Sequence, residues 1–188
     1  MRVVAGIFRG KKILEPKDSK TRPLKDLAKE SIFNILIHSN KFKLNLKNSE
    51  VLDLFSGVGS FGIECLSRGA KNVTFVENYN GVLPVLKRNL ENLKSINNFQ
   101  VLEININESE LFKNLNKQFD IIFLDPPFKN KNLSVLLNSI ENHNTLNKNG
   151  IIIIHRHKSE IDQIPENFEI IEEKKYGLSK IIYLSNLN

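Results

Sequence analysis

Residues 50–62, EVLDLFSGVGSFG, decide the fold of this 188-residue chain. An apolar run reaches Leu54, three glycines follow at positions 57, 59 and 62, and an apolar helical pattern continues beyond them. A buried strand that enters a helix through such a turn is typical of nucleotide-binding folds, because glycine lets the backbone approach a ligand closely. This stretch therefore predicts a nucleoside cofactor at the carboxyl end of a strand.

The rest of the chain repeats the strand–helix rhythm of this stretch. Such alternation implies a parallel sheet with helices on both faces. The tail differs, because Phe168–Glu173 and Ser179–Leu184 are two strand-like runs with no helix between them, which predicts an antiparallel pair at one edge. The fold expected is α/β, with a Rossmann-like, mostly parallel sheet of seven strands. We predict strands near 50–55, 73–77, 99–104, 120–125 and 150–155 and helices near 60–68, 80–95, 108–116 and 132–146.

The amino-terminal segment carries the charge of the protein. Residues 1–47 hold 12 Lys or Arg against four Asp or Glu, whereas residues 48–188 hold 15 against 17. Short β-type runs with Gly6 and Gly10 predict a hairpin over residues 2–14. A basic arm over residues 1–20, beside a catalytic domain over 21–188, suits phosphate binding. A solvated basic face kept for solubility explains the charge alone equally well.

Composition favours a soluble, cytoplasmic protein without a membrane partner. The longest apolar runs, such as Ile151–Ile154, are far shorter than the roughly 20 residues that span a bilayer, and no signal-peptide core follows Met1. The single cysteine, Cys65, excludes an internal disulfide, which fits a reducing compartment. No pattern of metal ligands stands out, so we expect no metal site.

Two acidic residues flank the glycine turn and bear on the choice of cofactor. Glu77 ends the next predicted strand, 20 residues after Gly57, where an acid would meet ribose hydroxyls. This pattern alone also suits NAD, and such a turn can be purely structural. Asp53 favours S-adenosylmethionine, because a carboxylate before the turn would crowd a pyrophosphate but can hold the ammonium group of a methionine moiety. The alternative role of Asp53 is to brace the turn.

The fourth predicted strand ends in Asp125-Pro126-Pro127-Phe128. Proline removes N–H groups and leaves carbonyls and the carboxylate free to accept hydrogen bonds. The Asp125 side chain and the Pro126 carbonyl could hold the two N–H groups of an exocyclic amine and aim its nitrogen at a methyl donor. Phe128 could stack on a base, which contributes about 1–3 kcal/mol in single-strand recognition. The alternative is a rigid turn with a core phenylalanine.

These residues resemble the amino-group methyltransferases marked by (Asp/Asn/Ser)-Pro-Pro-(Tyr/Phe), which are class I S-adenosylmethionine-dependent enzymes. Nearly the whole chain resembles the RsmD type of bacterial 16S ribosomal RNA guanine-N2 methyltransferase. The match is carried by Arg2-Val-Val-Ala-Gly, Arg9-Gly-Lys, Thr21-Arg-Pro followed by Lys29-Glu and Phe33-Asn, Leu52-Asp-Leu-Phe-Ser-Gly-Val-Gly, Leu66-Ser-Arg-Gly-Ala and Asp125-Pro-Pro-Phe.

The resemblance implies transfer of a methyl group to guanine N2 of the small-subunit RNA, in an assembling subunit. It implies that Arg22 borders the cofactor or RNA site and that Glu77 binds the ribose. This chain departs from the family at Asn78 and Asn105, where acids are common, and at His155-Arg156-His157, where an acidic residue is common at the end of the fifth strand. The candidate catalytic residues are Asp125, Pro126, Pro127 and Phe128; the cofactor-binding ones are Asp53, Phe55, Ser56, Gly57, Gly59, Glu77, Asn78 and Asn105; the RNA-binding ones are Arg9, Lys11, Lys12 and Arg22.

Other functions remain open at this point. An NAD-dependent oxidoreductase shares the glycine turn but has no use for Asp-Pro-Pro-Phe or the basic arm. An adenine-N6 methyltransferase or a glutamine-N5 protein methyltransferase would use a similar tetrapeptide. A non-catalytic RNA-binding assembly factor could keep the fold, although the joint presence of Asp53, Glu77 and Asp125 argues against it.

Overall fold

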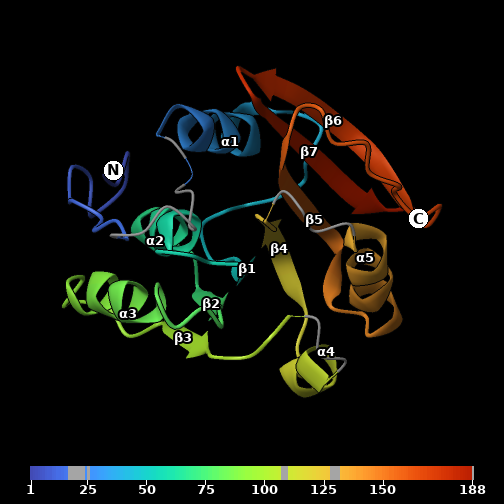
Figure 1. The fold of residues 1–188 in the computed structure, drawn as a ribbon. Helices are drawn as coiled ribbons and strands as arrows, with labels where there is room; N and C mark the ends of the chain where they lie inside the picture. Colours follow the sequence, from blue (N-terminus) through green and yellow to red (C-terminus); the bar gives the residue numbers. More distant parts are fainter. Residues whose placement is uncertain (17–23, 25, 107–109, 128–131, 188) are drawn as a thin grey trace.

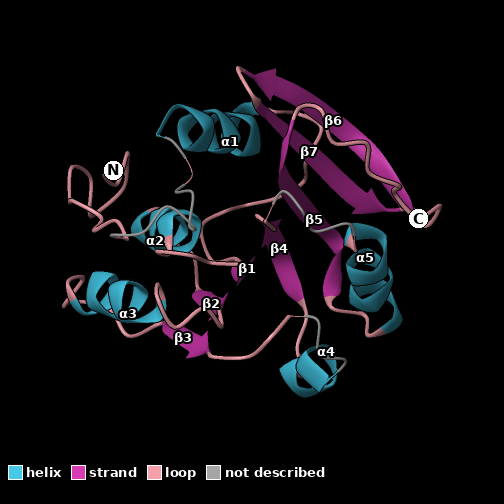
Figure 2. Cartoon of the chain, in the orientation of Figure 1, coloured by secondary structure: helices cyan, strands magenta, loops and turns pink. Residues whose placement is uncertain are grey.

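The computed structural model describes residues 1–16, 24, 26–106, 110–127 and 132–187. In chain order, its helices and strands (Figures 1 and 2) are α1 (Asp26–His38), β1 (Glu50–Leu54), α2 (Ser60–Ser67), β2 (Asn72–Val76), α3 (Leu83–Glu91), β3 (Phe99–Leu102), α4 (Glu110–Leu115), β4 (Phe119–Leu124), α5 (Leu133–Asn142), β5 (Leu146–His157), β6 (Phe168–Tyr176) and β7 (Ser179–Asn186).

The strands form one seven-stranded sheet in the order β3-β2-β1-β4-β5-β7-β6. Strands β1 to β5 are parallel, whereas β7 is antiparallel to both β5 and β6. The predicted antiparallel pair at one edge is therefore confirmed. The strand order changes direction between β1 and β4, which places a ligand crevice outside the carboxyl ends of these two strands.

Two predicted helices are shorter than their apolar patterns. The helix expected over 132–146 ends at Asn142, because Asn144 has a positive φ of 49° and the Thr145 N–H turns back to the Ile140 carbonyl at 2.9 Å. The chain then enters β5 at Leu146. The helix expected over 80–95 spans Leu83–Glu91, with a proline in its first turn.

Alternating side chains divide the core between the two faces of the sheet. Ile121 and Phe123 of β4 belong to the cluster that includes residues of α1, α2 and α3, whereas Ile122 and Leu124 belong to the cluster with α4 and α5. Figure 1 shows these two helix groups on opposite sides of the sheet. Because both faces are covered, the central strands are continuous apolar runs.

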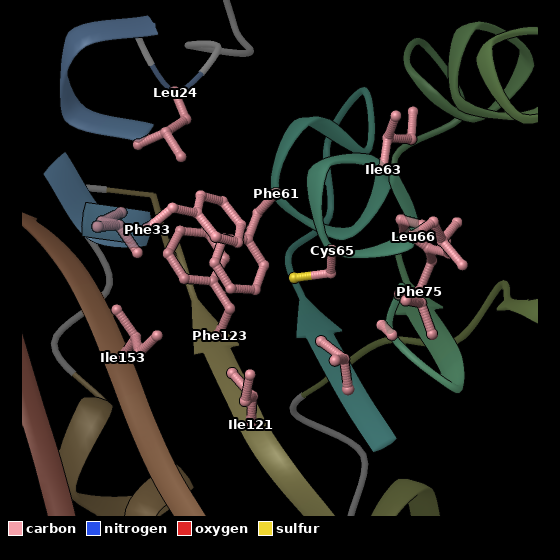
Figure 3. Close-up of a cluster of buried hydrophobic side chains, with 14 of the residues drawn as sticks. Leu24, Phe33, Phe61, Ile63, Cys65, Leu66, Phe75, Ile121, Phe123 and Ile153 are labelled. Atoms are coloured by element: carbon pink, nitrogen blue, oxygen red, sulfur yellow. The ribbon is translucent and has the colours of Figure 1, made fainter. Parts of the chain in front are cut away.

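Three phenylalanine rings fasten α1 and α2 to the middle of the sheet (Figure 3). The Phe61 ring of α2 lies between the Phe123 ring of β4, with centroids 4.1 Å apart, and the Phe33 ring of α1, with centroids 5.2 Å apart. All three side chains are buried. The stack fixes the helix that follows the glycine turn directly over β4.

The amino-terminal arm is docked on the helices of this face. The hairpin predicted over residues 2–14 reduces to one antiparallel bridge, Arg2–Lys12, while Val3 and Ile13 join the buried cluster of the same face. Polar groups complete the docking, because the Asn89 side chain of α3 accepts from the Leu14 N–H at 2.8 Å and donates to the Leu14 carbonyl at 3.1 Å.

Glu64 of α2 is the main polar anchor of the arm. Its fully buried carboxylate accepts hydrogen bonds from the Val4 N–H at 2.7 Å, the Ala5 N–H at 2.9 Å and the Arg68 guanidinium at 2.8 Å. The buried ammonium group of Lys29 lies 3.8 Å away and donates to the Arg2 carbonyl at 2.6 Å. Burial lowers the pKa of Lys29, and the charge of Glu64 opposes that shift.

Truncation of the central ring should destabilise the protein. We predict that Phe61→Ala lowers the free energy of unfolding by about 3–5 kcal/mol, because it removes a fully buried ring between two others. Urea denaturation followed by circular dichroism measures the change. Ile161→Ala is the control, since that side chain is 97% exposed. Equal denaturation midpoints for the two variants would contradict the role assigned to the stack.

Candidate active site

The glycine turn after β1 is held by Ser56 rather than by its glycines alone. Phe55 adopts a positive φ of 60°, as do Gly57 at 56° and Gly59 at 82°. The Ser56 hydroxyl donates to the Asp53 carbonyl at 2.6 Å and accepts from the Val76 N–H at 2.9 Å. Ser56 thus ties the turn to the end of β2, and its hydroxyl is committed to that contact.

Asp53 lies beneath the turn with its side chain buried. One carboxylate oxygen accepts the Gly62 N–H of α2 at 2.9 Å. Burial raises the pKa of Asp53 well above its usual range, and the negative charges of Asp125 and Glu77 raise it further. A ligand cation beside Asp53 would stabilise its charged form.

Glu77 follows β2 and closes the other side of the turn. One of its carboxylate oxygens accepts the Gly57 N–H at 2.8 Å, and the other accepts the N–H groups of Asn78 and Tyr79, both at 2.9 Å. A carboxylate has about four lone-pair positions. Three are used by the backbone, so a ribose hydroxyl would take the remaining position or displace one of these contacts.

Asp125 lies at the carboxyl end of β4, directly across from the turn. Its N–H approaches the Leu54 carbonyl of β1 at 3.5 Å. One carboxylate oxygen, Oδ1, lies 2.9 Å from Nδ1 of His155 at the end of β5. Pro126 is buried and Pro127 is exposed, while Phe128 lies outside the described residues.

Four ionisable side chains gather on one face of the sheet at this edge. Asp53, Asp125 and His155 each continue the alternation that sends Val51, Phe123 and Ile153 toward α1 and α2. Glu77 continues the same alternation on β2 after Phe75. The motifs predicted the three acids to meet here, and the structure brings them together.

The carboxylate set fits a ligand that carries positive charge. Within the described ranges, none of the three acids pairs with a lysine or arginine. Asp53 and Asp125 would face an ammonium and a sulfonium group, and Glu77 would accept from ribose hydroxyls. S-adenosylmethionine carries all three kinds of group. Asn78 and Asn105 follow β2 and β3 at the same edge and are exposed.

His155 is the member of the site that sequence reasoning missed. The parallel register pairs Leu124 with Ile154, so the next residue of each strand, Asp125 and His155, must be neighbours. That register was the available signal. The predicted strand ends, 125 and 155, agree with this register, but the sequence did not show that the two strands are neighbours in the sheet.

The predicted RNA-binding residues are placed differently from one another. Arg9 and Lys12 are exposed on the docked arm. The ammonium group of Lys11 instead donates to the Asn92 carbonyl after α3 and lies 5.3 Å from the centroid of the Phe8 ring. Arg22 lies outside the described residues.

Neither a metal-ligand cluster nor a membrane-spanning helix is present in the described part of the chain. No three His, Cys, Asp or Glu side chains among those residues gather as potential ligands of one metal ion. Among the helices of the same residues, none combines the length and the apolar character needed to cross a membrane.

Comparison with known sequences identifies relatives over almost the whole chain. The family model described as "Conserved hypothetical protein 95" matches residues 1–185. Ribosomal RNA small subunit methyltransferase D of Haemophilus influenzae is 36% identical over 180 residues, which cover 95% of this chain and 90% of that protein. The protein of the same name from Escherichia coli K12 is 29% identical over 181 residues, which cover 94% and 85%.

Solved structures give the same result for the fold. An Escherichia coli protein described as a candidate methyltransferase superposes with a TM-score of 0.82 at 27% identity and covers 99% of this chain and 97% of its own. A Haemophilus influenzae protein described as a candidate methylase gives 0.77 at 33% identity, with 100% and 99% covered. With the observed strand order, these neighbours confirm the predicted Rossmann-like sheet of class I methyltransferases.

The buried charge of Asp53 should reduce the stability of the unliganded protein. We predict that Asp53→Asn raises the melting temperature at pH 8 by a few degrees. The reason is that the folded wild type holds Asp53 at a raised pKa and therefore loses stability as pH rises from the ordinary aspartate value to the raised one. The difference in melting temperature between the variant and the wild type should become smaller toward pH 4.

Thermal melting between pH 4 and 8 checks this prediction. Glu103→Gln is the control, because Glu103 forms a half-exposed surface pair with Lys87 and should show no such pH-dependent gain. A lower melting temperature for Asp53→Asn at pH 8 would contradict the prediction.

Proposed function

The chain belongs to the family described as "Conserved hypothetical protein 95", and on this premise we propose that it transfers a methyl group from S-adenosylmethionine to the exocyclic N2 amino group of a guanine in small-subunit ribosomal RNA. The observation that carries the proposal is the position of Asp125 at the end of β4, across the switch point from the glycine turn and beside Asp53. Relatives named as ribosomal RNA small subunit methyltransferase D support the RNA substrate.

The cofactor is held by residues of the first two strands. Asp53 takes the methionine ammonium group, Glu77 takes the ribose hydroxyls, and the turn through Gly57 and Gly59 lets the backbone approach. S-adenosylmethionine supplies an electrophilic methyl group on a positively charged sulfur. Asn105, after β3, completes the nucleoside site through its side-chain oxygen.

The chain's own contribution to catalysis is alignment of the acceptor. An exocyclic amine is a weak nucleophile, because its lone pair is delocalised into the ring. Asp125 and the Pro126 carbonyl accept the two N–H groups and direct the nitrogen toward the methyl donor, so proximity and orientation supply most of the rate. The nitrogen loses a proton as it gains the methyl group, and the Asp125 carboxylate is placed to receive it.

A second RNA-contacting surface lies on the docked arm, whose turn packs on Ser67 at the end of α2 away from the glycine turn. Arg9 and Lys12 are exposed there and would contact phosphates, while Phe128 and Arg22 would border the base and its backbone. We regard residues 1–20 as the RNA-binding arm and 21–188 as the methyltransferase domain. An assembling small subunit in the cytoplasm is the substrate particle we propose.

Labelled methyl transfer tests the proposal. The chain is incubated with labelled S-adenosylmethionine and, in parallel, with small subunits lacking the modification, naked ribosomal RNA or DNA, and the products are digested to nucleosides. The result expected is N2-methylguanosine in the ribosomal samples. Label in adenine or in protein would overturn the guanine assignment, and cofactor binding without transfer to any sample would overturn the proposed reaction on this substrate.

Removal of the Asp125 carboxylate should abolish alignment of the acceptor amine and leave binding of S-adenosylmethionine intact. We predict that Asp125→Ala lowers kcat at least about 10²-fold and leaves the Kd of S-adenosylmethionine nearly unchanged. Single-turnover transfer and calorimetric titration measure the two quantities. Asp120→Ala is the matched control, because that carboxylate binds Glu50 N–H at the opposite end of β4. An active Asp125→Ala variant would remove the residue from the reaction.

Charge reversal on the arm should weaken RNA binding through lost phosphate contacts. We predict that Arg9→Glu with Lys12→Glu lowers affinity for ribosomal RNA and reduces the salt slope by about 0.7–0.9 per lost phosphate contact. Binding measured at several salt concentrations gives the slope. The control reverses Lys71 and Lys148, which are exposed near the amino ends of β2 and β5. An unchanged slope in the arm variant would exclude the arm from the interface.

A further inference from the structure

We infer that His155, held by Ser179, is a positioning residue that fixes the orientation of the Asp125 carboxylate. This inference rests on the proposed function, since it concerns how Asp125 is presented to the amine. The His155 ring bridges the two residues: Nδ1 lies 2.9 Å from Asp125 Oδ1, and Nε2 lies 2.9 Å from Ser179 Oγ. No motif in the sequence assigns a role to either partner.

The sheet register brings the three residues together. Asp125 and His155 follow the paired residues Leu124 and Ile154 of the parallel strands β4 and β5. On the other side, β7 is antiparallel to β5 and pairs Ser179 with His157, so Ser179 is the diagonal neighbour of His155 on the same face. The chain of contacts thus crosses three adjacent strands at the catalytic edge.

The contacts select one form of the neutral imidazole. With the proton on Nδ1, the ring donates to the Asp125 carboxylate, and Nε2 accepts from the Ser179 hydroxyl. The other tautomer would set the Nδ1 lone pair against a carboxylate oxygen. The carboxylate of Asp125 therefore selects this tautomer, since it can only accept, and the Ser179 hydroxyl, which can donate or accept, adds a second contact that fixes the ring in place.

The consequence for Asp125 is that its two oxygens are no longer equivalent. Oδ1 is occupied by His155, whereas Oδ2 has no hydrogen-bond partner among the residues that the structure describes. The side chains of Asp125 and His155 are only 19% and 10% exposed, so water competes weakly for their contact. Oδ2 is then the oxygen turned to the N–H of the substrate, and His155 acts through Asp125 without touching the amine.

The chain contains a matched control for this arrangement. His157 lies two residues further along β5 and also pairs with a serine, with Nδ1 2.6 Å from Ser159 Oγ, but it is not bonded to Asp125. We compare His155→Leu with His157→Leu in single-turnover methyl transfer to ribosomal RNA. The expected result is a loss in kcat on the order of 10-fold to 10²-fold for His155→Leu alone, with the RNA KM and the Kd of S-adenosylmethionine unchanged.

Conservative variants separate positioning from folding. His155→Asn keeps a donor near the Nδ1 position and should recover most of kcat, whereas His155→Gln carries its amide farther out and should not. Ser179→Ala should lower kcat by a smaller factor than His155→Leu does and should leave the RNA KM and the Kd of S-adenosylmethionine unchanged. In an Asp125→Asn background, His155→Leu should have little further effect on kcat, because the oriented group is already gone.

The failures of the two proposals are distinguishable. A wild-type chain that methylates none of the samples overturns the proposed function. An active wild type whose kcat is unchanged in His155→Leu, or whose loss is equal in His157→Leu, overturns the positioning role alone. If thermal melting shows that His155→Leu is unfolded, the comparison of His155→Asn with His155→Gln tests the inference instead. Equal kcat values for these two variants would contradict it.

Discussion

The parallel pairing of β1 with β4 is the constraint on which the rest of the site depends. The pairing of Leu54 with Leu124 brings two chain segments 70 residues apart to a common edge. On one side of this pair β1 is followed in the sheet by β2, and on the other side β4 is followed by β5, so the connections after β1 and β4 lead away from each other. A crevice is therefore expected between the loops that follow these two strands, and Asp53 of β1 and Asp125 after β4 lie beside it. A shift of either strand by one residue would send its carboxylate to the opposite face.

A second buried charge, that of Glu64, fixes the arm against α2. Glu64 satisfies two backbone N–H groups of the arm, and removing one member of such a buried set leaves an uncompensated charge, which generally destabilises by about 3–5 kcal/mol. The same helix α2 carries Phe61 into the ring stack and supplies the Gly62 N–H to Asp53. One helix thus joins the arm, the core and the candidate active site, so the basic residues of the arm are held at a fixed place relative to that site.

Much of the fold was predictable because the parallel strands are continuous apolar runs and the glycine turn has few alternatives. The boundaries were less predictable: the helix predicted over 132–146 runs four residues past the observed end at Asn142, because the left-handed Asn144 carries no strong signal in an asparagine-rich chain. The acids of the site could be placed from their strand ends. His155 and Glu64 could not, since their roles depend on partners 30 and about 60 residues away. Arg22 and Phe128 remain predictions.

The central claim is that the carboxyl edge of β1, β2 and β4 holds the methyl donor with its reactive group toward Asp125. A crystal structure of the chain with S-adenosylhomocysteine tests this most directly. The account predicts the ammonium group at Asp53, the ribose hydroxyls within about 3 Å of Glu77 and the sulfur turned toward the Asp125–Pro126 segment. A nucleoside bound away from this edge, or a sulfur turned away from Asp125, would contradict it.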